Sequence, residues 1–417
     1  MKLGLIGKDL KYSLSKKIHE MLSGNCYELL SFPNESDVKD FLREDFGFVN
    51  VTIPYKTLAF ESCDELAKIA KETHTVNLII NRKGKLQGFN TDAYGFAYLL
   101  DKYRIKVEGK DCIIFGTGAT SRTIKYVLTI RGAKSIKFLS RNPRAEDHVS
   151  YDDIEAIEKA QIIINSTPVG TNDLKAKNLI DFNNAKACEY FVDVVYNPHK
   201  SNMVLAAKEC GIKAYGGLAM LVGQAVRTNE LFYGKKYNKS DVDEIYRKVA
   251  ISTLNLVLIG HPFSGKTTIS TCLARELILP WIDVDAEIVR RENGMSIAQI
   301  FEKKGEEYFR EMESAVIEEY SSKVGYILSL GAGAVLNKKN MDLLVHNSII
   351  FNIKRDIDTI DEKSMFGRPL TRTKKELSKI IENRAKIYEK YEDYTIDSTS
   401  SINDAVELIR RSIWNFM

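Results

Sequence analysis

Short apolar runs alternate with amphipathic stretches along the whole chain, and this pattern predicts an α/β protein. Each run is bounded by turn residues, as is typical of strands that are buried in parallel sheets. The runs are KLGLIG (2–7), CYELLSF (26–32), GFVNVTIP (47–54), KDCIIFG (110–116), SIKFLSR (135–141), AQIIINSTP (160–168), YFVDVVY (190–196), LNLVLIG (254–260), PWIDVD (280–285), GYILSLG (325–331) and SIIFNI (348–353). Helix-like segments lie between them, so we expect α/β folds with parallel sheets.

A polar stretch at 233–253 interrupts this alternation. The chain has 417 residues, which is more than one compact core usually spans. We interpret the stretch as a last helix plus a linker, with domains at 1–248 and 249–417. An internal surface helix of one large domain is the alternative, but the fresh strand and loop that follow favour a boundary.

The sequence FGTGATSRT (115–123) predicts a loop that binds a dinucleotide. Gly116 permits a tight turn after the strand, and Gly118 lets the backbone approach a pyrophosphate at a helix N-terminus. Ser121 stands where the usual fingerprint has its third glycine, so a turn without ligand remains an alternative for this loop alone.

The end of the next strand carries Ser140, Arg141 and, close by, Arg144. An NAD site would favour an acidic residue here, whereas a guanidinium matches the 2′-phosphate of NADP. The alternative is a solvated basic loop, but the position at the strand end favours NADP.

Six polar clusters occur at strand ends in a fixed order: YSLS (12–15), NVTIPYK (50–56), VNLI (76–79), GFNTDAYG (88–95), NSTPVG (165–170) and GGLAMLVGQA (216–225). Together they resemble the shikimate dehydrogenase family over roughly residues 1–235. The resemblance implies NADPH-dependent reduction of 3-dehydroshikimate to shikimate. It also implies two lobes, a substrate lobe at about 1–92 plus 218–248 and a Rossmann-like NADP lobe at about 93–217.

By this resemblance Lys56 and Asp92 form the catalytic pair, in which a carboxylate orients an ammonium that can donate a proton. Which of the two carries the proton at each step stays open, and alone each has a structural alternative, a surface lysine or a helix cap. The implied substrate ligands are Ser13, Ser15, Thr52, Asn77, Tyr196 and Gln224. The implied cofactor ligands are Gly116, Gly118, Ala119, Thr120, Ser140, Arg141, Arg144, Thr167, Val194 and Gly217. Ala119 and Thr120 depart from the family's common Gly and Ala.

A second phosphate-binding sequence, GHPFSGKTT (260–268), satisfies the G-x-x-x-x-G-K-[ST] pattern after an apolar strand. Backbone N–H groups of such a loop cradle phosphates, Lys266 neutralises the β/γ oxygens, and the Thr267 hydroxyl ligates Mg²⁺. We therefore expect ATP as the ligand. The further loop residues assigned to it are Gly260, Phe263, Ser264, Gly265 and Thr268.

The residues after this loop resemble the shikimate kinase family over roughly 254–400. The motifs are WIDVD, a helix containing Arg310, the glycine-rich LSLGAGAVL, GRPL and ENRAKIYEKYED. The resemblance implies a P-loop kinase with a parallel sheet, in which Arg310 and Arg384 clamp the shikimate carboxylate. It assigns acceptor-hydroxyl binding and the candidate base to Asp285, Mg²⁺ to Asp283 and Thr267, a substrate-side turn to Gly331, Ala332 and Gly333, and a lid position to Arg368. Ala332 replaces a glycine and would be strained if its φ were positive.

Composition adds little to this picture. The net charge of +4 does not suggest a nucleic-acid or membrane partner, and the six scattered cysteines have no metal-ligand spacing. No apolar run has the length of a membrane span, and the N-terminal run is too short for a signal peptide, so we expect a cytoplasmic protein. The oligomeric state stays open.

The combined motifs predict one enzyme with both activities, using NADP(H), ATP and Mg²⁺ on small-molecule substrates. A metabolite-sensing regulator or scaffold that kept both folds is the alternative of another class. It would be expected to lose the lysines and acids, yet Lys56, Asp92, Lys266 and Asp285 are all present. A dehydrogenase that uses quinate or prefers NAD is the enzymatic alternative.

Overall fold

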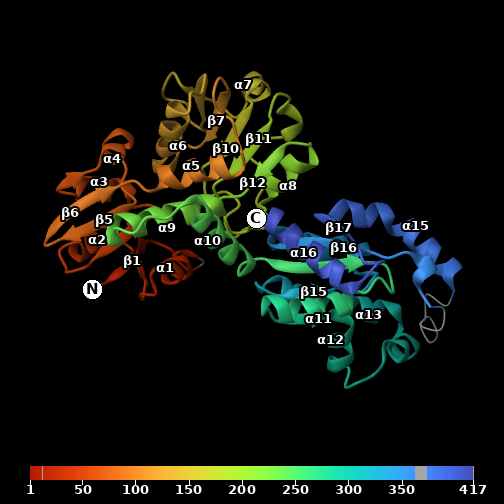
Figure 1. Cartoon of the computed structure of the whole chain (residues 1–417). Coiled ribbons are helices and arrows are strands. Elements are labelled where there is room, and N and C mark those ends of the chain that lie inside the picture. The colour runs from red at the N-terminus through yellow and green to blue at the C-terminus, as the bar shows by residue number, and fades with distance from the viewer. Residues whose placement is uncertain (12, 362–372, 417) are drawn as a thin grey trace. The chain divides into compact units, whose positions relative to one another are not determined.

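The computed structural model describes residues 1–11, 13–361 and 373–416. The chain divides into two compact units, Met1–Tyr246 and Arg247–Met417 (Figure 1). The first unit contains two sheets and the second unit one. The α/β class and the parallel strands predicted from the apolar runs are confirmed.

The first sheet has the strand order β2-β1-β3-β5-β6-β4. Its strands are β1 (Leu3–Gly7), β2 (Glu28–Ser31), β3 (Phe48–Val51), β4 (Glu65–Leu66), β5 (Leu78–Arg82) and β6 (Lys85–Phe89). The strands β1, β2 and β3 are parallel, but β5 runs antiparallel to both β3 and β6. The predicted apolar runs did not include β5 and β6, which form a hairpin in which Lys83 and Gly84 make a tight turn with positive φ values of 56° and 84°.

Four helices follow the strands of this first lobe: α1 (Ser15–Ser23), α2 (Glu35–Phe41), α3 (Lys56–Glu61) and α4 (Lys68–Thr73). Buried apolar side chains pack on both faces of the sheet, with Ile6, Val49 and Ile79 on one face and Leu5, Phe48 and Leu78 on the other. Because successive side chains of a strand point to opposite faces, alternate residues of each strand supply the two cores.

The second lobe is a parallel sheet of order β12-β11-β10-β7-β8-β9. Its strands are β7 (Asp111–Phe115), β8 (Ser135–Leu139), β9 (His148–Val149), β10 (Ile162–Asn165), β11 (Tyr190–Asp193) and β12 (Lys213–Tyr215), and its helices are α6 (Ala119–Ile130), α7 (Ile154–Lys159) and α8 (Asn202–Glu209), with a 3₁₀ turn η1 (Phe182–Asn184). The chain order reverses between β7 and β10, and ligands of such sheets bind where the strand order reverses.

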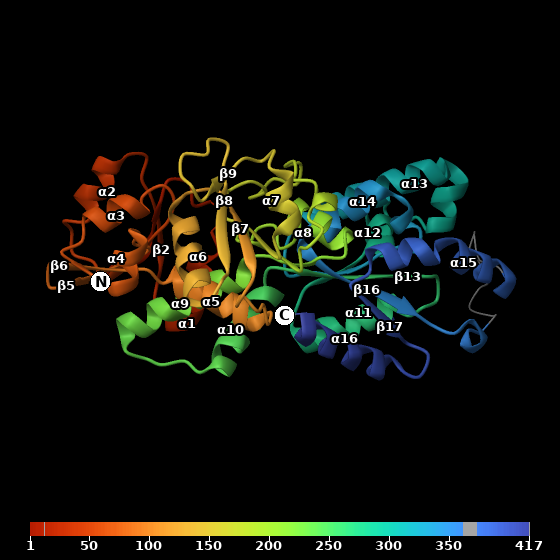
Figure 2. The same ribbon diagram turned by 90° about the horizontal axis from the view of Figure 1, so that it is seen from above.

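Two helices connect the lobes, α5 (Asp92–Lys102) and α9 (Leu218–Tyr233). Figures 1 and 2 show them lying side by side. Glycines allow this close approach, since a Cβ on Gly223 would lie 3.0 Å from the Gly95 Cα. The two lobes are thus joined by one tightly packed pair of helices.

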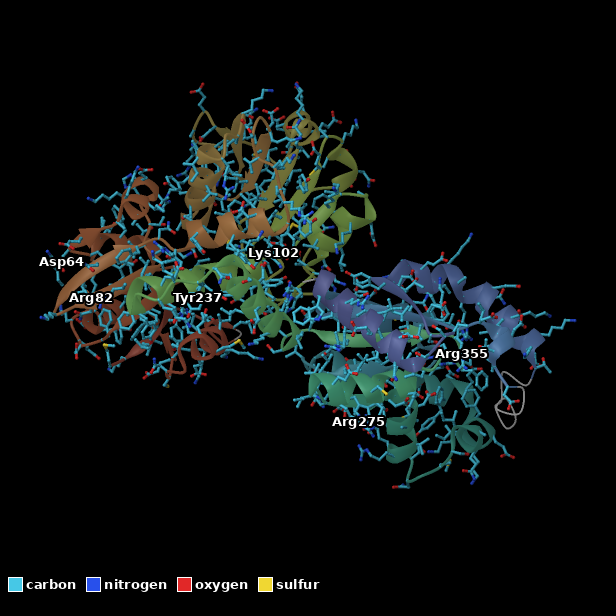
Figure 3. The ribbon with its side chains drawn as sticks, viewed as in Figure 1. Asp64, Arg82, Lys102, Tyr237, Arg275 and Arg355 are labelled. Carbon is cyan, nitrogen blue, oxygen red and sulfur yellow. The ribbon has the colours of Figure 1, made fainter. Side chains whose placement is uncertain are left out.

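Helix α10 (Lys239–Ile251) follows, and the boundary of the two units falls within it. Its first half is held by the first unit: the Tyr246 hydroxyl lies 3.0 Å from that of Tyr103, and Lys102 lies 4.1 Å from the Tyr246 ring centroid. Lys102 is labelled in Figure 3 at the end of α5. The 233–253 stretch is therefore mostly helix.

The second unit is a parallel sheet of order β14-β15-β13-β16-β17. Its strands are β13 (Asn255–Gly260), β14 (Trp281–Asp283), β15 (Ile327–Ser329), β16 (Ser348–Lys354) and β17 (Tyr394–Asp397). Its helices are α11 (Lys266–Leu277), α12 (Val284–Arg291), α13 (Ile297–Ser321), α14 (Lys338–Leu344), α15 (Lys374–Tyr391) and α16 (Ile402–Phe416), with 3₁₀ turns η2 (Ala334–Leu336), η3 (Val345–Asn347) and η4 (Ile357–Thr359). No helix among the described residues is both long and apolar enough to cross a membrane.

Candidate active sites

A cavity of about 750 Å³ opens between the two lobes of the first unit. It is lined by twelve of the residues that the sequence predicts for this site: Ser13, Ser15, Thr52, Lys56, Asn77, Asp92, Thr120, Thr167, Val194, Tyr196, Gly217 and Gln224. They come from both lobes and from α9. Segments that are far apart in the sequence therefore meet around one space of small-molecule size.

The centre of this cavity is a buried ion pair. Lys56 is the first residue of α3 and Asp92 is the first residue of α5, and each is 8% exposed. The Lys56 Nζ donates a hydrogen bond of 2.5 Å to the Asp92 Oδ2, and Asn77 donates one of 2.8 Å to the Oδ1. No side chain caps the N-terminus of α5, and the Asp92 carboxylate bonds Lys56 and Asn77 instead.

Asn50 extends this polar network, although sequence reasoning assigned it no role. It is buried, lines the cavity, and accepts a hydrogen bond of 2.9 Å from the Tyr27 hydroxyl. Its amide donates to Thr228 at 3.1 Å and lies 3.5 Å from the Gln224 Oε1. The signal that could have found it is its place in the NVTIPYK cluster, two residues before Thr52.

Ser13 and Tyr196 contact each other at the cavity, which Ser15 also lines. Burial raises the pKa of Tyr196, and a hydrogen bond with Ser13 opposes that rise. The Ser15 backbone N–H donates to the Ser13 Oγ at 3.2 Å. These hydroxyl groups are well suited to binding a carboxylate or ring hydroxyls of a polar ligand.

The dinucleotide loop connects β7 to α6. Gly116 has a φ of 92°, which favours glycine, and a Cβ on Gly118 would meet no atom within 4 Å, so space is open beside the loop. Ser121, in place of the third glycine, bonds the Ser166 hydroxyl at 2.7 Å. The loop is thereby tied to the loop after β10, and Thr120 reaches the Lys56 Nζ at 3.3 Å.

The predicted 2′-phosphate residues lie at the end of β8, outside the cavity lining. Arg141 and Arg144 are exposed, and Ser140 is partly buried. The Ser140 Oγ accepts a hydrogen bond from the Asn142 N–H, and the Arg144 N–H donates to His148. Both guanidinium groups are therefore at the surface beyond the dinucleotide loop, where charge can attract a phosphate.

A second cavity, of about 1110 Å³, lies in the second unit. The predicted residues that line it are Phe263, Gly265, Lys266, Thr267, Thr268, Asp283, Asp285, Arg310, Gly331, Ala332, Gly333 and Arg384. Gly260 and Ser264 belong to the loop but not to the lining. Arg368 lies outside the described residues.

The phosphate loop itself connects the central strand β13 to α11. Phe263 and Gly265 have positive φ values of 65° and 90°, so the loop curls back and α11 begins at Lys266. The buried Lys266 Nζ donates to the carbonyl oxygens of Gly260 and His261 at 3.0 and 2.9 Å. Together with the helix N-terminus, this ammonium makes the loop attractive to phosphate.

The Thr267 hydroxyl donates a hydrogen bond of 2.6 Å to the Asp283 Oδ2. Asp283 ends β14 and caps α12 through its other oxygen, which accepts from the Ala286 N–H. Among the described residues no group of three or more His, Cys, Asp or Glu could hold a metal ion. A hydroxyl and one carboxylate suit Mg²⁺, which keeps waters and takes further ligands from phosphates.

The opposite wall of the cavity gathers acidic and basic side chains around Gly331. A Cβ there would lie 2.6 Å from the Glu313 Oε1 and 2.9 Å from the Asp285 Oδ1, so both carboxyl groups face this glycine. Glu313 pairs with Arg310 at 2.9 Å, and burial raises its pKa to about 7. Sequence reasoning missed Glu313, although it stands one helical turn after Arg310 on α13.

Ala332 occupies the middle of the substrate-side turn without strain, because it is not among the described residues with positive φ. Its carbonyl oxygen accepts hydrogen bonds of 2.8 Å from both Arg384 and Tyr388. The methyl group is therefore compatible with the turn, and the carbonyl holds Arg384 at the edge of the cavity.

These folds and cavities define a two-lobed, dinucleotide-dependent dehydrogenase joined to a P-loop kinase. The family model described as "Shikimate dehydrogenase substrate binding domain" matches residues 5–79, and that described as "Shikimate kinase" matches residues 262–413. The NADP(+) shikimate dehydrogenase of Clostridium perfringens (strain 13) is 34% identical over 271 residues, which cover 60% of this chain and 98% of that protein. That of Thermoplasma acidophilum is 30% identical over 272 residues, covering 62% and 98%.

Two solved structures also resemble the first unit. A chorismate mutase/shikimate 5-dehydrogenase fusion protein from Clostridium acetobutylicum is 30% identical, with a TM-score of 0.56 and coverage of 59% of this chain and 96% of that one. Shikimate 5-dehydrogenase from Thermus thermophilus, in complex with NADP(H) and shikimate, is 27% identical, with a TM-score of 0.53 and coverage of 60% and 99%. The chain therefore belongs to the shikimate dehydrogenase family and carries a shikimate kinase domain.

Proposed function

We propose that the chain performs two consecutive reactions of aromatic biosynthesis: reduction of 3-dehydroshikimate by NADPH, then phosphorylation of shikimate by ATP. The observation that carries this proposal is that one chain contains two cavities, each lined by side chains suited to catalysis. One contains a buried ammonium–carboxylate pair, and the other places Asp285 and two arginines opposite a phosphate loop. The product of the first reaction is the substrate of the second.

In the first cavity, bound NADPH supplies the hydride. Lys56 would donate a proton to the ketone oxygen as negative charge develops there, and the Asp92 carboxylate would orient the ammonium. Asn77 holds the second carboxylate oxygen at 2.8 Å, which leaves the Oδ2 directed at Lys56. Ser13, Ser15 and Tyr196 would bind the carboxylate and hydroxyls of the substrate.

The residues near the first cavity fit a dinucleotide phosphate. The φ of 92° at Gly116 and the open space beside Gly118 allow a pyrophosphate to approach the α6 N-terminus. The remaining predicted contacts, Thr167, Val194 and Gly217, line the cavity on the side of the second lobe. The exposed Arg141 and Arg144 would bind the 2′-phosphate, which supports NADP over NAD.

In the second cavity, bound ATP with Mg²⁺ supplies the phosphoryl group. Asp285 would accept a hydrogen bond from the reacting hydroxyl and take its proton, while Arg310 and Arg384 would bind the carboxylate. Lys266 would exchange its loop carbonyl partners for phosphate oxygens, and Thr267 with Asp283 would hold the Mg²⁺. Arg368 completes the proposal as a lid residue, on the resemblance alone.

The alternative, a metabolite-sensing regulator or scaffold, requires folded sites without turnover. The intact Lys56–Asp92 pair favours an enzyme. So does the phosphate loop, in which Lys266 is held at its base and Thr267 bonds Asp283. We propose a division at 248/249, with a substrate lobe at about 1–92 plus 218–248 and an NADP lobe at about 93–217, and a cytoplasmic location.

Two separate assays test the proposal. The purified full chain should oxidise NADPH only when 3-dehydroshikimate is added, and should release ADP from ATP only when shikimate is added. Ligand binding without either turnover would instead establish the regulator.

A further inference from the structure

Asp193 lies at the end of β11 and contacts the two loops, after β10 and after β11, that line the first cavity at Thr167 and at Val194–Tyr196. It is 0% exposed and does not line the cavity. No motif of the sequence singles it out. Its buried carboxylate nevertheless accepts hydrogen bonds from three partners, Asn165, Val195 and Ser201.

The first loop follows β10. The Asn165 amide donates to the Asp193 Oδ1 at 2.8 Å, and the Asn165 Oδ1 in turn accepts from the Thr167 hydroxyl at 2.6 Å and from its backbone N–H at 3.0 Å. The side chain of Asn165 is therefore fixed at both ends. Through it, Asp193 determines where Thr167 lies.

The second loop follows β11 itself. The Val195 N–H donates to the same Asp193 Oδ1 at 3.0 Å, and the Val195 carbonyl accepts from the Gly217 N–H at 2.9 Å. The Ser201 hydroxyl donates to the Asp193 Oδ2 at 2.6 Å. The carboxylate thus holds the loop that carries Val194 and connects it to the turn before α9.

Burial raises the pKa of Asp193 to about 6, and its three hydrogen bonds oppose that rise. The carboxylate is therefore ionised at neutral pH, where hydrogen bonds to a charged acceptor are stronger than those to a neutral one. A buried acceptor shared by two loops fixes both, because moving either loop would leave a donor unpaired.

We propose that Asp193 is a positioning residue for the dehydrogenase reaction, which couples the Asn165–Thr167 loop to the Val194–Tyr196 loop so that together they hold the nicotinamide end of the cofactor. This inference rests on the proposed NADPH-dependent reduction. It predicts a defect in cofactor use rather than a general loss of structure.

The test uses the full chain with Asp193→Ala, Asp193→Asn, Asn165→Ala and the double Ala variant. Asp193→Ala should raise the KM for NADPH by about tenfold or more, because both loops lose their shared acceptor. Asp193→Asn should recover most of that loss, since its oxygen can face Asn165 and Val195 while its amide faces Ser201. Glu209→Ala, at an exposed carboxylate of the same lobe, serves as the control and should behave like wild type.

The double variant should lose less than the sum of the two single losses, because Asn165 and Asp193 share the hydrogen bond that joins them. Additive losses, or a folded Asp193→Ala variant with an unchanged KM for NADPH, would overturn the inference. If Asp193→Ala does not fold, Asn165→Ala decides, and an unchanged KM for NADPH contradicts the coupling. A wild-type chain without NADPH oxidation would refute the proposed function instead, so the two failures are distinguishable.

Discussion

The Lys56 ammonium and the Asp92 carboxylate lie 2.5 Å apart at the N-termini of two different helices, with both side chains almost fully buried. The pair survives burial because Asn77 and Thr120 add hydrogen bonds to it. This geometry gives the cavity a proton donor whose position is fixed before a substrate binds.

Replacing Lys56 by Met should therefore lower the kcat of NADPH oxidation by about 10²- to 10⁴-fold, the usual contribution of a general acid. Lys68→Met, at an exposed lysine of the next helix, is the matched control. The readout is initial rate at saturating substrate. A Lys56→Met enzyme that turns over like the control would remove Lys56 from the mechanism.

Lys266→Ala should abolish ADP release and leave NADPH oxidation nearly intact, because each cavity is built within its own unit. The exposed Lys339 offers a control substitution in the same unit. Both activities are measured on one preparation. Loss of both in a folded Lys266→Ala protein would show that the units are more strongly coupled than their separate sites imply.

Gly331→Ala should damage the kinase reaction, because the new Cβ would lie 2.6 Å from the Glu313 Oε1. Moving the carboxyl groups from their positions should lower the kcat/KM for shikimate by about 10²-fold. NADPH oxidation by the same variant is the internal control. Unchanged phosphorylation would mean that the carboxyl groups can move without consequence.

The stability of the second unit should depend on pH through Glu313. Burial raises its pKa from 4.5 to about 7, so the folded state keeps a proton that the unfolded state releases between these values. The contribution of Glu313 to the unfolding free energy should accordingly be lost as pH rises from 4.5 towards 7, by at most about 1.4 kcal/mol per pH unit.

Urea unfolding followed by tryptophan fluorescence can measure this contribution, because both tryptophans of the chain, Trp281 and Trp414, lie in the second unit. The difference in unfolding free energy between wild type and Glu313→Gln should shift in favour of the variant between about pH 5 and about pH 8. An identical difference at both pH values contradicts the raised pKa.

Cofactor preference tests the arginines at the end of β8. Arg141→Ala should lower the kcat/KM for NADPH relative to that for NADH by about tenfold or more, since one charged partner of the 2′-phosphate is lost. Arg43→Ala, at an exposed arginine of the first lobe, is the control. A wild-type preference for NADH would refute the role assigned to Arg141.

The sequence predicted the strands and phosphate loops well, because buried parallel strands read as apolar runs and the loops need glycines at set positions. It missed the β5–β6 hairpin, since the Lys83–Gly84 turn lacks the usual Asn-Gly or Asp-Gly signal. It also missed Asn50, Asp193 and Glu313. All three are buried, and their roles depend on contacts that only the fold brings together: Asn50 with Thr228, Asp193 with Asn165, and Glu313 with the Gly331 turn.

The central claim is that one chain converts 3-dehydroshikimate into shikimate 3-phosphate. The most direct measurement is mass-spectrometric detection of that product from 3-dehydroshikimate, with NADPH, ATP and Mg²⁺ supplied together or omitted one at a time. The account predicts shikimate 3-phosphate only in the complete mixture, and shikimate alone when ATP is omitted. Absence of shikimate 3-phosphate from the complete mixture would contradict it.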